Sequence, residues 1–175
     1  MAATSIVVQP MADADWPEVR RIYAEGIATG DATLEREAPD WTHFDHSHRH
    51  DCRLVARSTD GRPVLGWTAL TAYSSRRVYA GVAWESVYVA AARHGQGVGR
   101  ALLDAAIAAA EAAGFWALMA GILAENAASV ALHEPAGFRR VGVLERIGRD
   151  ASGRWRDVVL MQRGEARPPG EMQAD

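Results

Sequence analysis

The sequence predicts a mixed α/β domain with one sheet, in which antiparallel strands come first, a helical crossover follows and a hairpin closes the fold. Strand-like runs on both sides of Asp60-Gly61, a strong turn signal, predict a first hairpin. The apolar run 82–89 leads through a glycine-rich turn into an alanine-rich helix, which indicates a β-α-β unit. Two further strand-like runs surround Ala151-Ser152-Gly153 and predict the closing hairpin.

In the N-terminal half, the capping-box sequence Asp15-Trp16-Pro17-Glu18 begins a helix whose apolar residues share one face, and Gly30 ends it. A proline and mixed charges favour a loop after this helix. The expected segments are a strand over 5–8, a helix from 15 to about 30, a loop over 35–41, a short polar helix over 42–51, and the hairpin strands 53–58 and 64–73.

In the C-terminal half, Gly114 ends the alanine-rich helix, while Pro135 and Gly137 stop a shorter one. The expected segments are a strand over 82–89, a helix over 97–113, a strand over 116–122, a helix over 126–134, the hairpin strands 138–146 and 155–162, and a polar tail over 164–175. The strands 82–89 and 116–122 should be parallel or splayed apart. We expect one domain over residues 1–163.

Length and composition are those of a globular protein and exclude several classes. The chain has 175 residues, of which 49% are hydrophobic and 23% charged. Its formal net charge of -3 comes without a basic block, so we expect no nucleic-acid partner. Charged residues interrupt every apolar run, so we expect no membrane span. The single cysteine, Cys52, and an N-terminus without a secretory layout favour a reducing cytoplasm.

The turn between the strand 82–89 and the following helix has the features of an anion site. Its sequence is His94-Gly95-Gln96-Gly97-Val98-Gly99-Arg100. Three glycines let the backbone approach a ligand closely, and the first N–H groups of the helix have no partner within it. A phosphate or diphosphate would satisfy these groups.

This turn resembles the acetyl-CoA diphosphate loop of the GNAT acyltransferase superfamily, Gln/Arg-x-x-Gly-x-Gly/Ala, with His94 at the first position. Further segments are similar to the phosphinothricin N-acetyltransferase branch, so that the resemblance covers about residues 5–163. These segments are 22–29, Ala32-Thr33-Leu34-Glu35, Ser86-Val87-Tyr88-Val89, 125–133, Gly137-Phe138 and 153–158. The resemblance implies a mixed sheet flanked by helices, with a cleft where its fourth and fifth strands splay. It also implies a homodimer that moves an acetyl group from acetyl-CoA, without a metal, to the α-amino group of glutamate-like or methionine-sulfoximine-like amino acids.

The resemblance implies that the strand backbone at 87–89 pairs with the pantetheine arm and that the turn holds the diphosphate. Asn126 matches an asparagine that hydrogen-bonds the same arm, although it is also well suited to be a helix N-cap. Ser129 lies on the same helical face. The cofactor-binding residues expected are Val87, Tyr88, Val89, His94, Gly95, Gln96, Gly97, Val98, Gly99, Arg100, Asn126 and Ser129.

Catalytic roles are expected for Glu85, His133 and Asn126. His133 lies two helical turns beyond Asn126, and the family match implies that it donates a proton to the CoA sulfur. Trp84 occupies the position at which relatives carry the glutamate that serves as general base. Because strand neighbours face opposite sides, the adjacent Glu85 takes that role only if a bulge shifts the register. A water relay or Glu35 are the alternatives.

The resemblance implies that Arg76 and Tyr79, which keep the family's spacing to the strand 82–89, bind the substrate, and Arg77 is a second candidate. A guanidinium suits this role because it can bind a carboxylate or phosphinate with two hydrogen bonds. Two arginines on a solvated hairpin are the alternative. Leu34 and Glu35 complete the set of expected substrate-binding residues. Leu34 stands where many relatives have phenylalanine, and with the bulky Trp84 it predicts an altered side-chain preference.

Other functions remain open on the sequence. The acceptor could instead be a protein N-terminus, an aminoglycoside or a polyamine, although Arg76 and Arg77 favour an anionic acceptor. Trp84 also leaves room for a CoA-binding sensor without turnover. The histidines at 43, 46, 48 and 50 could hold a metal, but a solvated helix rim is the favoured interpretation. Trp155 and Asp157 are expected to hold the last hairpin or a dimer.

Overall fold

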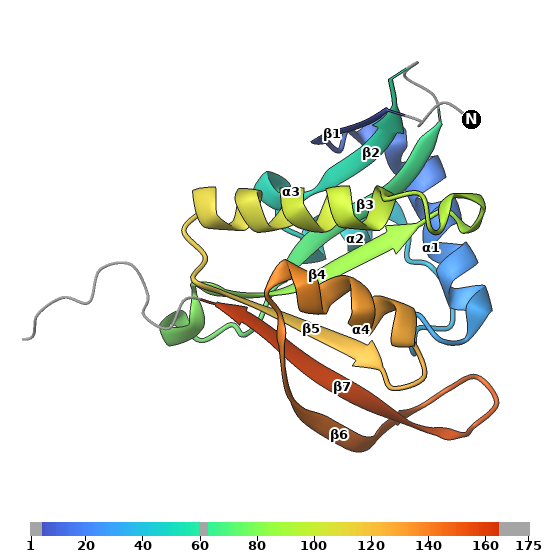
Figure 1. Cartoon of the computed structure of the whole chain (residues 1–175), viewed down its shortest axis with the longest axis vertical. Helices are drawn as coiled ribbons and strands as arrows, with labels where there is room; N and C mark the ends of the chain where they lie inside the picture. The colour runs from blue at the N-terminus through green and yellow to red at the C-terminus, as the bar shows by residue number, and fades with distance from the viewer. Residues whose placement is uncertain (1–4, 60–62, 165–175) are drawn as a thin grey trace, which may run out of the picture.

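The computed structural model describes residues 5–59 and 63–164, and within them seven strands form one mixed sheet. The strand order is β1-β2-β3-β4-β5-β7-β6, and every neighbouring pair is antiparallel except β4 and β5 (Figure 1). The strands are β1 (Ile6–Pro10), β2 (Leu54–Ser58), β3 (Val64–Ala72), β4 (Val82–Val89), β5 (Ala117–Leu123), β6 (Arg139–Arg149) and β7 (Trp155–Gly164). The turn expected at Asp60-Gly61 and all but the first residue of the expected tail lie outside the described residues.

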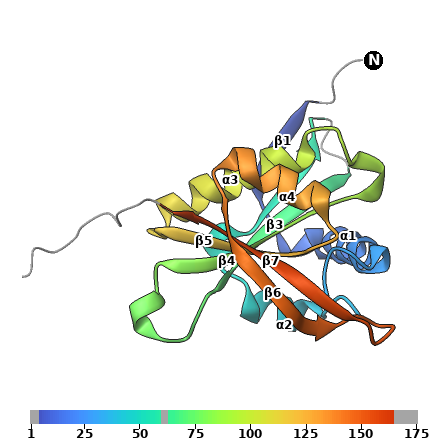
Figure 2. The ribbon, with the colours of Figure 1, turned by 60° about the horizontal axis from the view of Figure 1, so that its bottom comes forward.

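Helices cover both faces of this sheet. The helix α3 (Val98–Ala112) and the short α4 (Ala127–His133) lie on one face, and α1 (Trp16–Thr29) and α2 (Trp41–Ser47) lie on the other (Figures 1 and 2). The expected α/β class and the helical crossover between β4 and β5 are therefore confirmed. The helix expected over 42–51 ends earlier, and its central residue Phe44 is buried, so it is not the polar helix that the sequence suggested.

The start of α1 differs from the expected capping box. Asp15 is itself in the helical region of φ and ψ and makes no capping hydrogen bond. Its carboxylate instead accepts from the Ala12 N–H at 2.9 Å and pairs with Arg57. Glu18 accepts from the Val64 N–H at 2.9 Å. Through Arg57 and Val64, the two carboxylates therefore join the start of α1 to β2 and β3. At the other end, Gly30 has the left-handed φ of 74° that ends a helix.

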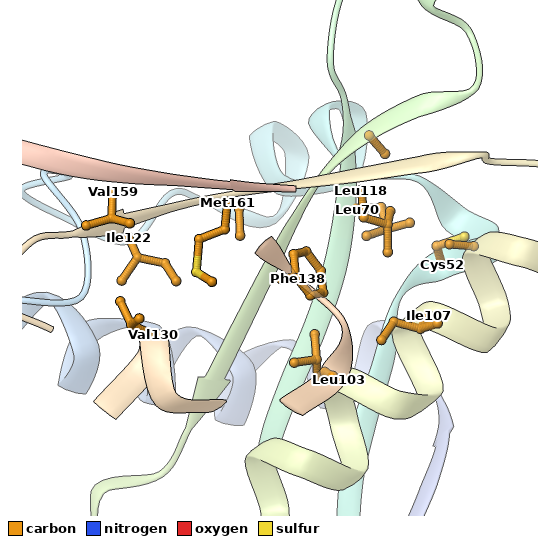
Figure 3. Packing of buried hydrophobic residues seen from close by; sticks show 14 residues of the cluster. Cys52, Leu70, Leu103, Ile107, Leu118, Ile122, Val130, Phe138, Val159 and Met161 are labelled. Atoms are coloured by element: carbon orange, nitrogen blue, oxygen red, sulfur yellow. The ribbon is translucent and has the colours of Figure 1, made fainter. Parts of the chain in front are cut away.

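Two apolar layers hold the helices to the sheet. Beneath α3 and α4 the layer is mainly aliphatic, with Phe138 near its centre (Figure 3). Beneath α1 and α2 it is rich in aromatic rings, in which Trp67 stacks on Tyr88 at a centroid distance of 4.7 Å. Burial of these side chains is the main favourable contribution to folding, at about 1.5–3 kcal/mol for each fully buried large residue.

The parallel pair β4 and β5 stays together only at its beginning. Val82–Trp84 pair with Ala117–Met119, and beyond this point β4 continues beside β3 alone and β5 beside β7 alone. The strands splay as the resemblance implied, and the β4 edge from Glu85 onward faces an opening instead of a neighbouring strand.

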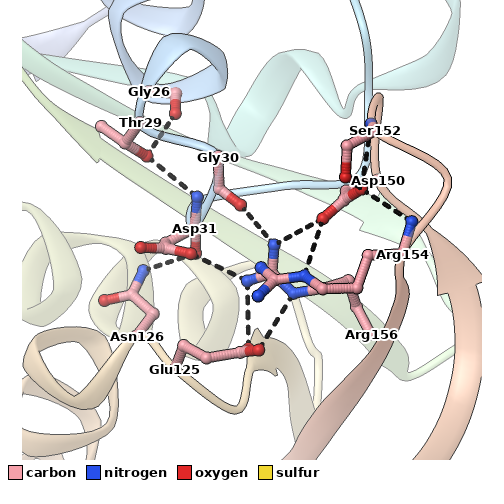
Figure 4. A network of polar contacts seen from close by, with 10 residues as sticks. All are labelled: Gly26, Thr29, Gly30, Asp31, Glu125, Asn126, Asp150, Ser152, Arg154 and Arg156. Atoms are coloured by element: carbon pink, nitrogen blue, oxygen red, sulfur yellow. Dashed lines mark hydrogen bonds and ion pairs between the residues drawn. The ribbon is translucent and has the colours of Figure 1, made fainter.

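Arg156 on β7 joins three loops at the edge of this opening (Figure 4). Its guanidinium donates to the Gly30 carbonyl at 2.8 Å, to Asp31 at 2.8 Å, and to both oxygens of Glu125 at 3.1 and 3.0 Å. A longer hydrogen bond of 3.3 Å reaches Asp150. The side chain is 1% exposed, and the hydrogen bond to Glu125 is the main reason that its pKa is raised further. This cluster fixes the segment after α1 to the turn before α4.

We expect Arg156→Met to lower the free energy of unfolding by about 1–3 kcal/mol. The loss arises because three carboxylates lose their shared cation, and it is moderated because Asp31 and Glu125 are half exposed. Chemical denaturation monitored by circular dichroism measures the change. Arg154→Met is the matched control, because Arg154 also pairs with Asp150 but is 62% exposed, and its loss should cost less than about 0.5 kcal/mol. Equal stability of both variants would contradict the structural role of Arg156.

Candidate active site

Two adjoining cavities occupy the opening between β4 and β5. The inner cavity, of about 370 Å³, lies between the splayed strands, α4 and the segment 32–35. The outer cavity, of about 620 Å³, runs between the glycine-rich turn, the end of α1 and the start of α4. Residues that line both are Ala32, Val87, Tyr88, Asn126 and Ser129. The two cavities thus form one groove along β4.

The glycine-rich turn presents backbone N–H groups to the outer cavity. Gly97 has a left-handed φ of 82° with open space where a side chain would stand, and α3 begins immediately after it. The first hydrogen bond within this helix joins the Ala101 N–H to the Gly97 carbonyl at 3.0 Å, so the N–H groups of residues 98–100 precede it. Together with the helix dipole, these groups favour an anion. The turn therefore fits a diphosphate.

Side chains around the turn brace it from outside. His94 Nε2 lies 3.0 Å from the Val89 carbonyl, and Gln96 donates to the Ala92 carbonyl at 3.0 Å. From α1, Glu25 accepts from the Ala91 N–H at 3.0 Å. Every residue expected to bind the cofactor lines one of the two cavities except Gln96, whose amide is used to hold the turn.

Glu85 and His133 meet at the floor of the inner cavity. Glu85 Oε1 lies 2.5 Å from His133 Nε2, and His133 Nδ1 lies 2.7 Å from the Ser129 carbonyl oxygen. The two side chains are 3% and 1% exposed. Burial lowers the pKa of His133, but the hydrogen bond and charge of Glu85, with the Ser129 carbonyl, outweigh burial and raise it overall.

No bulge shifts the β3–β4 register, which pairs Glu85 with Leu70 and Trp84 with Thr71. Glu85 therefore faces α4 by ordinary strand alternation, while Trp84 faces the opposite side. The bulge that was the condition for a role of Glu85 is therefore absent from the β3–β4 pairing. The splayed strands open the cavity to both sides of β4, so Glu85 lines it without one.

Asn126 is a helix N-cap, as the simpler interpretation held. Its Oδ1 accepts from the Ser129 N–H at 3.0 Å, and its Nδ2 donates to the Asp31 carbonyl at 3.1 Å. Both polar ends of the side chain are thus occupied within the protein. The residue nevertheless lines both cavities, so its placement beside the groove agrees with the sequence.

The opposite wall of the inner cavity combines aromatic, hydroxyl and carboxylate groups. Leu34 and Glu35, expected to bind substrate, lie here together with Tyr23, Thr33 and Ser86. Burial raises the pKa of Tyr23, and the charge of Glu35 adds to the effect. Sequence patterning alone does not mark Tyr23, Thr33 or Ser86 as site residues. Their places in segments shared with the family were the one available signal.

Arg76, Arg77 and Tyr79 line neither cavity. They lie in and beside the short helical turn η3 (Arg77–Tyr79), before β4 begins, whereas the groove lies where β4 ends (Figure 1). Arg76 stacks over the Tyr79 ring at 5.4 Å. Tyr73 links this loop to the sheet, since it packs against both Tyr79 and Trp84. Within one chain the loop and the groove are separate.

The histidines of the N-terminal half are held by local contacts. The Nδ1 atoms of His46 and His48 contact carbonyl oxygens of their own helix at 2.7 and 2.9 Å. In the ranges that the structure covers, no three histidine, cysteine, aspartate or glutamate side chains gather as a metal site would require.

Among the residues that the structure describes, no helix is long and apolar enough to cross a membrane.

The last hairpin contains the two residues expected to stabilise it. Asp157 Oδ1 accepts from the Arg146 N–H at 2.7 Å, next to an irregularity in the β6–β7 pairing. The Trp155 ring packs under the guanidinium groups of Arg146 and Arg149 at 5.2 and 4.2 Å. Both contacts hold the hairpin, and neither residue lines the groove.

Comparison with known proteins relates this groove to a family. Residues 16–138 match the acetyltransferase (GNAT) family model. The chain is 37% identical to a phosphinothricin N-acetyltransferase of Alcaligenes faecalis, over 93% of this chain and 84% of that protein. It is 31% identical to an L-methionine sulfoximine/L-methionine sulfone acetyltransferase of Pseudomonas paraeruginosa, over 85% of this chain and 88% of that protein.

A solved structure shows the same architecture with the cofactor present. It is a GNAT superfamily phosphinothricin acetyltransferase from Sinorhizobium meliloti in complex with acetyl-CoA. Its TM-score is 0.83 at 28% identity, and the alignment covers 95% of this chain and 94% of that one. The splayed strands, the glycine-rich turn and these similarities agree, and the chain belongs to the GNAT acetyltransferase family.

Proposed function

We propose that this protein transfers the acetyl group of acetyl-CoA to the α-amino group of a small amino acid or a glutamate-like analogue. The observation that carries the proposal is the continuous groove from the phosphate-binding turn to the buried Glu85–His133 pair. Relatives named for phosphinothricin and methionine sulfoximine acetylation support the class of acceptor.

The groove provides what acetyl transfer to an amine requires. Bound acetyl-CoA supplies an activated thioester. The N–H groups at 98–100 hold its diphosphate, and the free edge of β4 at 87–89 lies where its pantetheine arm can pair with the backbone. That arm leads towards Glu85 and His133, which we assign to proton transfer because they are buried at the splay. Asn126 keeps the start of α4 in place beside the arm.

The acceptor binds, in this proposal, between Leu34, Glu35 and Tyr23 on one side and β5 on the other. Leu34 fits closely against the last hairpin, since a Cβ at Gly148 would come within 2.5 Å of its Cδ1. This contact makes the shape of the pocket depend on residue 34. Glu35 places a carboxylate in the same pocket, where it can accept a hydrogen bond from the acceptor's amino group.

We also propose a homodimer. β6 is an edge strand with exposed apolar side chains, among which Val143 is 54% and Ile147 55% exposed. Val78 and Tyr79 are exposed on the β3–β4 loop as well. Association of two copies would cover such surfaces. It could also bring Arg76 and Arg77 to an acceptor bound in the groove of the partner copy, since the groove of their own chain lies at the other end of β4.

A cytoplasmic location is part of the same proposal, because a single cysteine, Cys52, favours a reducing compartment. Cys52 is also fully buried. Burial raises the pKa of its thiol to about 11, so it stays protonated and unreactive.

We expect release of free CoA thiol when the protein is mixed with acetyl-CoA and methionine sulfoximine or neutral amino acids. Because Leu34 replaces a larger side chain, phosphinothricin should not be the best acceptor, and Leu34→Phe should change the ratio of kcat/KM between acceptors by up to about 10-fold. A thiol-reactive dye measures the rates. Binding of CoA without release above hydrolysis would indicate a sensor, and a clear optimum for phosphinothricin would contradict the altered preference.

Gly97→Glu should weaken acetyl-CoA binding at least about 100-fold, because a carboxylate then faces the diphosphate and a side chain occupies left-handed backbone. Isothermal titration calorimetry measures the affinity. Gly97→Asn is the matched control, since asparagine tolerates this conformation and brings no charge, and its loss should be far smaller. Unchanged affinity in Gly97→Glu would remove the turn from the site.

In solution, light scattering should give about twice the chain mass of 18.9 kDa. Val143→Lys should shift the protein towards the monomer, because it places a charge on the apolar face of β6. Val7→Lys on β1, at the far edge of the sheet and 44% exposed, should leave the mass unchanged. A native protein that stays monomeric at high concentration would refute the dimer.

A further inference from the structure

We propose that Glu85 and His133 act as one proton-sharing base whose working atom is Glu85 Oε2, and that His133 is a positioning residue without a separate acid role. This proposal rests on the acetyl transfer proposed above. It replaces the division of labour that the resemblance implied, in which Glu85 is the base and His133 the proton donor.

The hydrogen bonds of His133 leave no ring nitrogen for the substrate. The Ser129 carbonyl oxygen can only accept, so His133 Nδ1 donates to it at 2.7 Å. The other ring nitrogen, Nε2, lies 2.5 Å from Glu85 Oε1, with one proton between them. With both nitrogens engaged and 1% of the side chain exposed, His133 has neither a lone pair nor a proton directed at the groove.

Glu85 has the opposite arrangement. Its Oε2 is buried and has no hydrogen-bond partner among the residues that the structure describes. Glu85 lines the inner cavity, on the stretch of β4 that has lost its β5 neighbour. A buried carboxylate oxygen without a donor is costly, and native proteins rarely leave one unless a ligand satisfies it. The N–H of an incoming amine is a donor of the required kind.

Few charged side chains lie on the elements around the Glu85–His133 pair, so the two groups mainly determine each other's protonation. Within their described bounds β3 and β5 carry no charged residue, β4 carries only Glu85, and α4 carries only His133. On α3 the charged side chains of Arg100, Asp104 and Glu111 are about half exposed. The remaining titratable groups of the cavity are Glu35 and the phenols of Tyr23 and Tyr88 across the groove.

The sign of the pH dependence follows from this arrangement. The pKa of His133 is raised because the contributions of Glu85 and Ser129 exceed the cost of burial. The pair therefore keeps its shared proton up to a pH above about 6.5, the ordinary value for histidine. Loss of the shared proton leaves the pair free to accept the proton of the amine, so activity should rise as the pH increases through the raised pKa of His133.

One proton passes through Oε2 in each turnover. As the neutral amine forms its C–N bond to the acetyl carbon, its N–H bond breaks and the proton moves to Glu85 Oε2. The C–S bond breaks with its electron pair on sulfur, and Glu85 Oε2 returns the proton to the thiolate. The pair ends in its starting state, and the products are the acetylated amine and the free thiol. The hydrogen bond from His133 Nδ1 to the Ser129 carbonyl keeps the ring beside Glu85 throughout.

A double-mutant cycle distinguishes one unit from two independent residues. The variants are Glu85→Gln, His133→Gln and both together, with kcat for acetylation of methionine sulfoximine and KM for acetyl-CoA as readouts. We expect Glu85→Gln to lower kcat at least about 100-fold, with little change in KM for acetyl-CoA. The double variant should be no slower than Glu85→Gln alone, because the pair acts as a unit. His133→Gln should retain more activity than Glu85→Gln, because its amide still donates to Glu85.

His46→Gln is the matched control, because His46 is an exposed histidine bonded to a carbonyl of its own helix, far from the groove along the chain. It should leave kcat unchanged. A double variant whose loss equals the product of the two single losses would overturn the proposal in favour of separate acid and base. So would a Glu85→Gln variant with native kcat.

Nitrogen-detected NMR of the native protein gives a second test that needs no variant. We expect the His133 ring to lose its second ring proton with a midpoint above pH about 6.5, the ordinary value for histidine. The acid limb of kcat/KM should have the same midpoint. A ring whose midpoint lies below pH about 6.5 would refute the pair. Should no amine be acetylated, the proposed function would fail, and this titration would still decide whether the pair exists.

Discussion

The groove along β4 depends on the early end of pairing between β4 and β5. Three residues of each strand pair, and then each strand keeps only its other neighbour. A parallel pair normally buries both of its backbone edges, whereas here one edge of β4 is available to a ligand along the residues that lead to the glycine-rich turn. The same divergence makes room for α4 to bring His133 against Glu85. The proposed cofactor binding and the proposed proton transfer thus share one topological cause.

Most of the fold could be predicted from local sequence. Gly30 and Gly97 both adopt the left-handed conformation that glycine favours, and the strand, turn and helix around Gly97 follow from the sequence alone. Where a prediction from local sequence was wrong, a contact with residues distant in sequence replaced the expected local one. Asp15 looks like a cap, yet its carboxylate is occupied by Arg57 on β2, which is 42 positions away in sequence. Phe44 likewise turns a segment that reads as polar into part of the core.

The site was predictable as a set of residues and less so as an arrangement. The family pattern marked Glu85, His133 and Asn126, but the residues of the closest contact, Glu85 and His133, are 48 positions apart in sequence. Their hydrogen bond requires the splay, which pairing rules for an ordinary parallel sheet do not give. The position of Arg76 and Arg77 away from the groove was equally hidden, because the spacing to β4 fixes their distance along the chain and not the end of the strand at which the ligand lies.

The Arg156 cluster has a consequence for how this protein can change over evolutionary time. One guanidinium serves carboxylates from three loops that are far apart in sequence, and each carboxylate is tolerated at its position because the same cation neutralises it. A substitution at Asp31, Glu125 or Asp150 therefore alters the cost of substitutions at the other two. The loops that border the groove are epistatically linked, and drift in one constrains the substitutions that the others can accept.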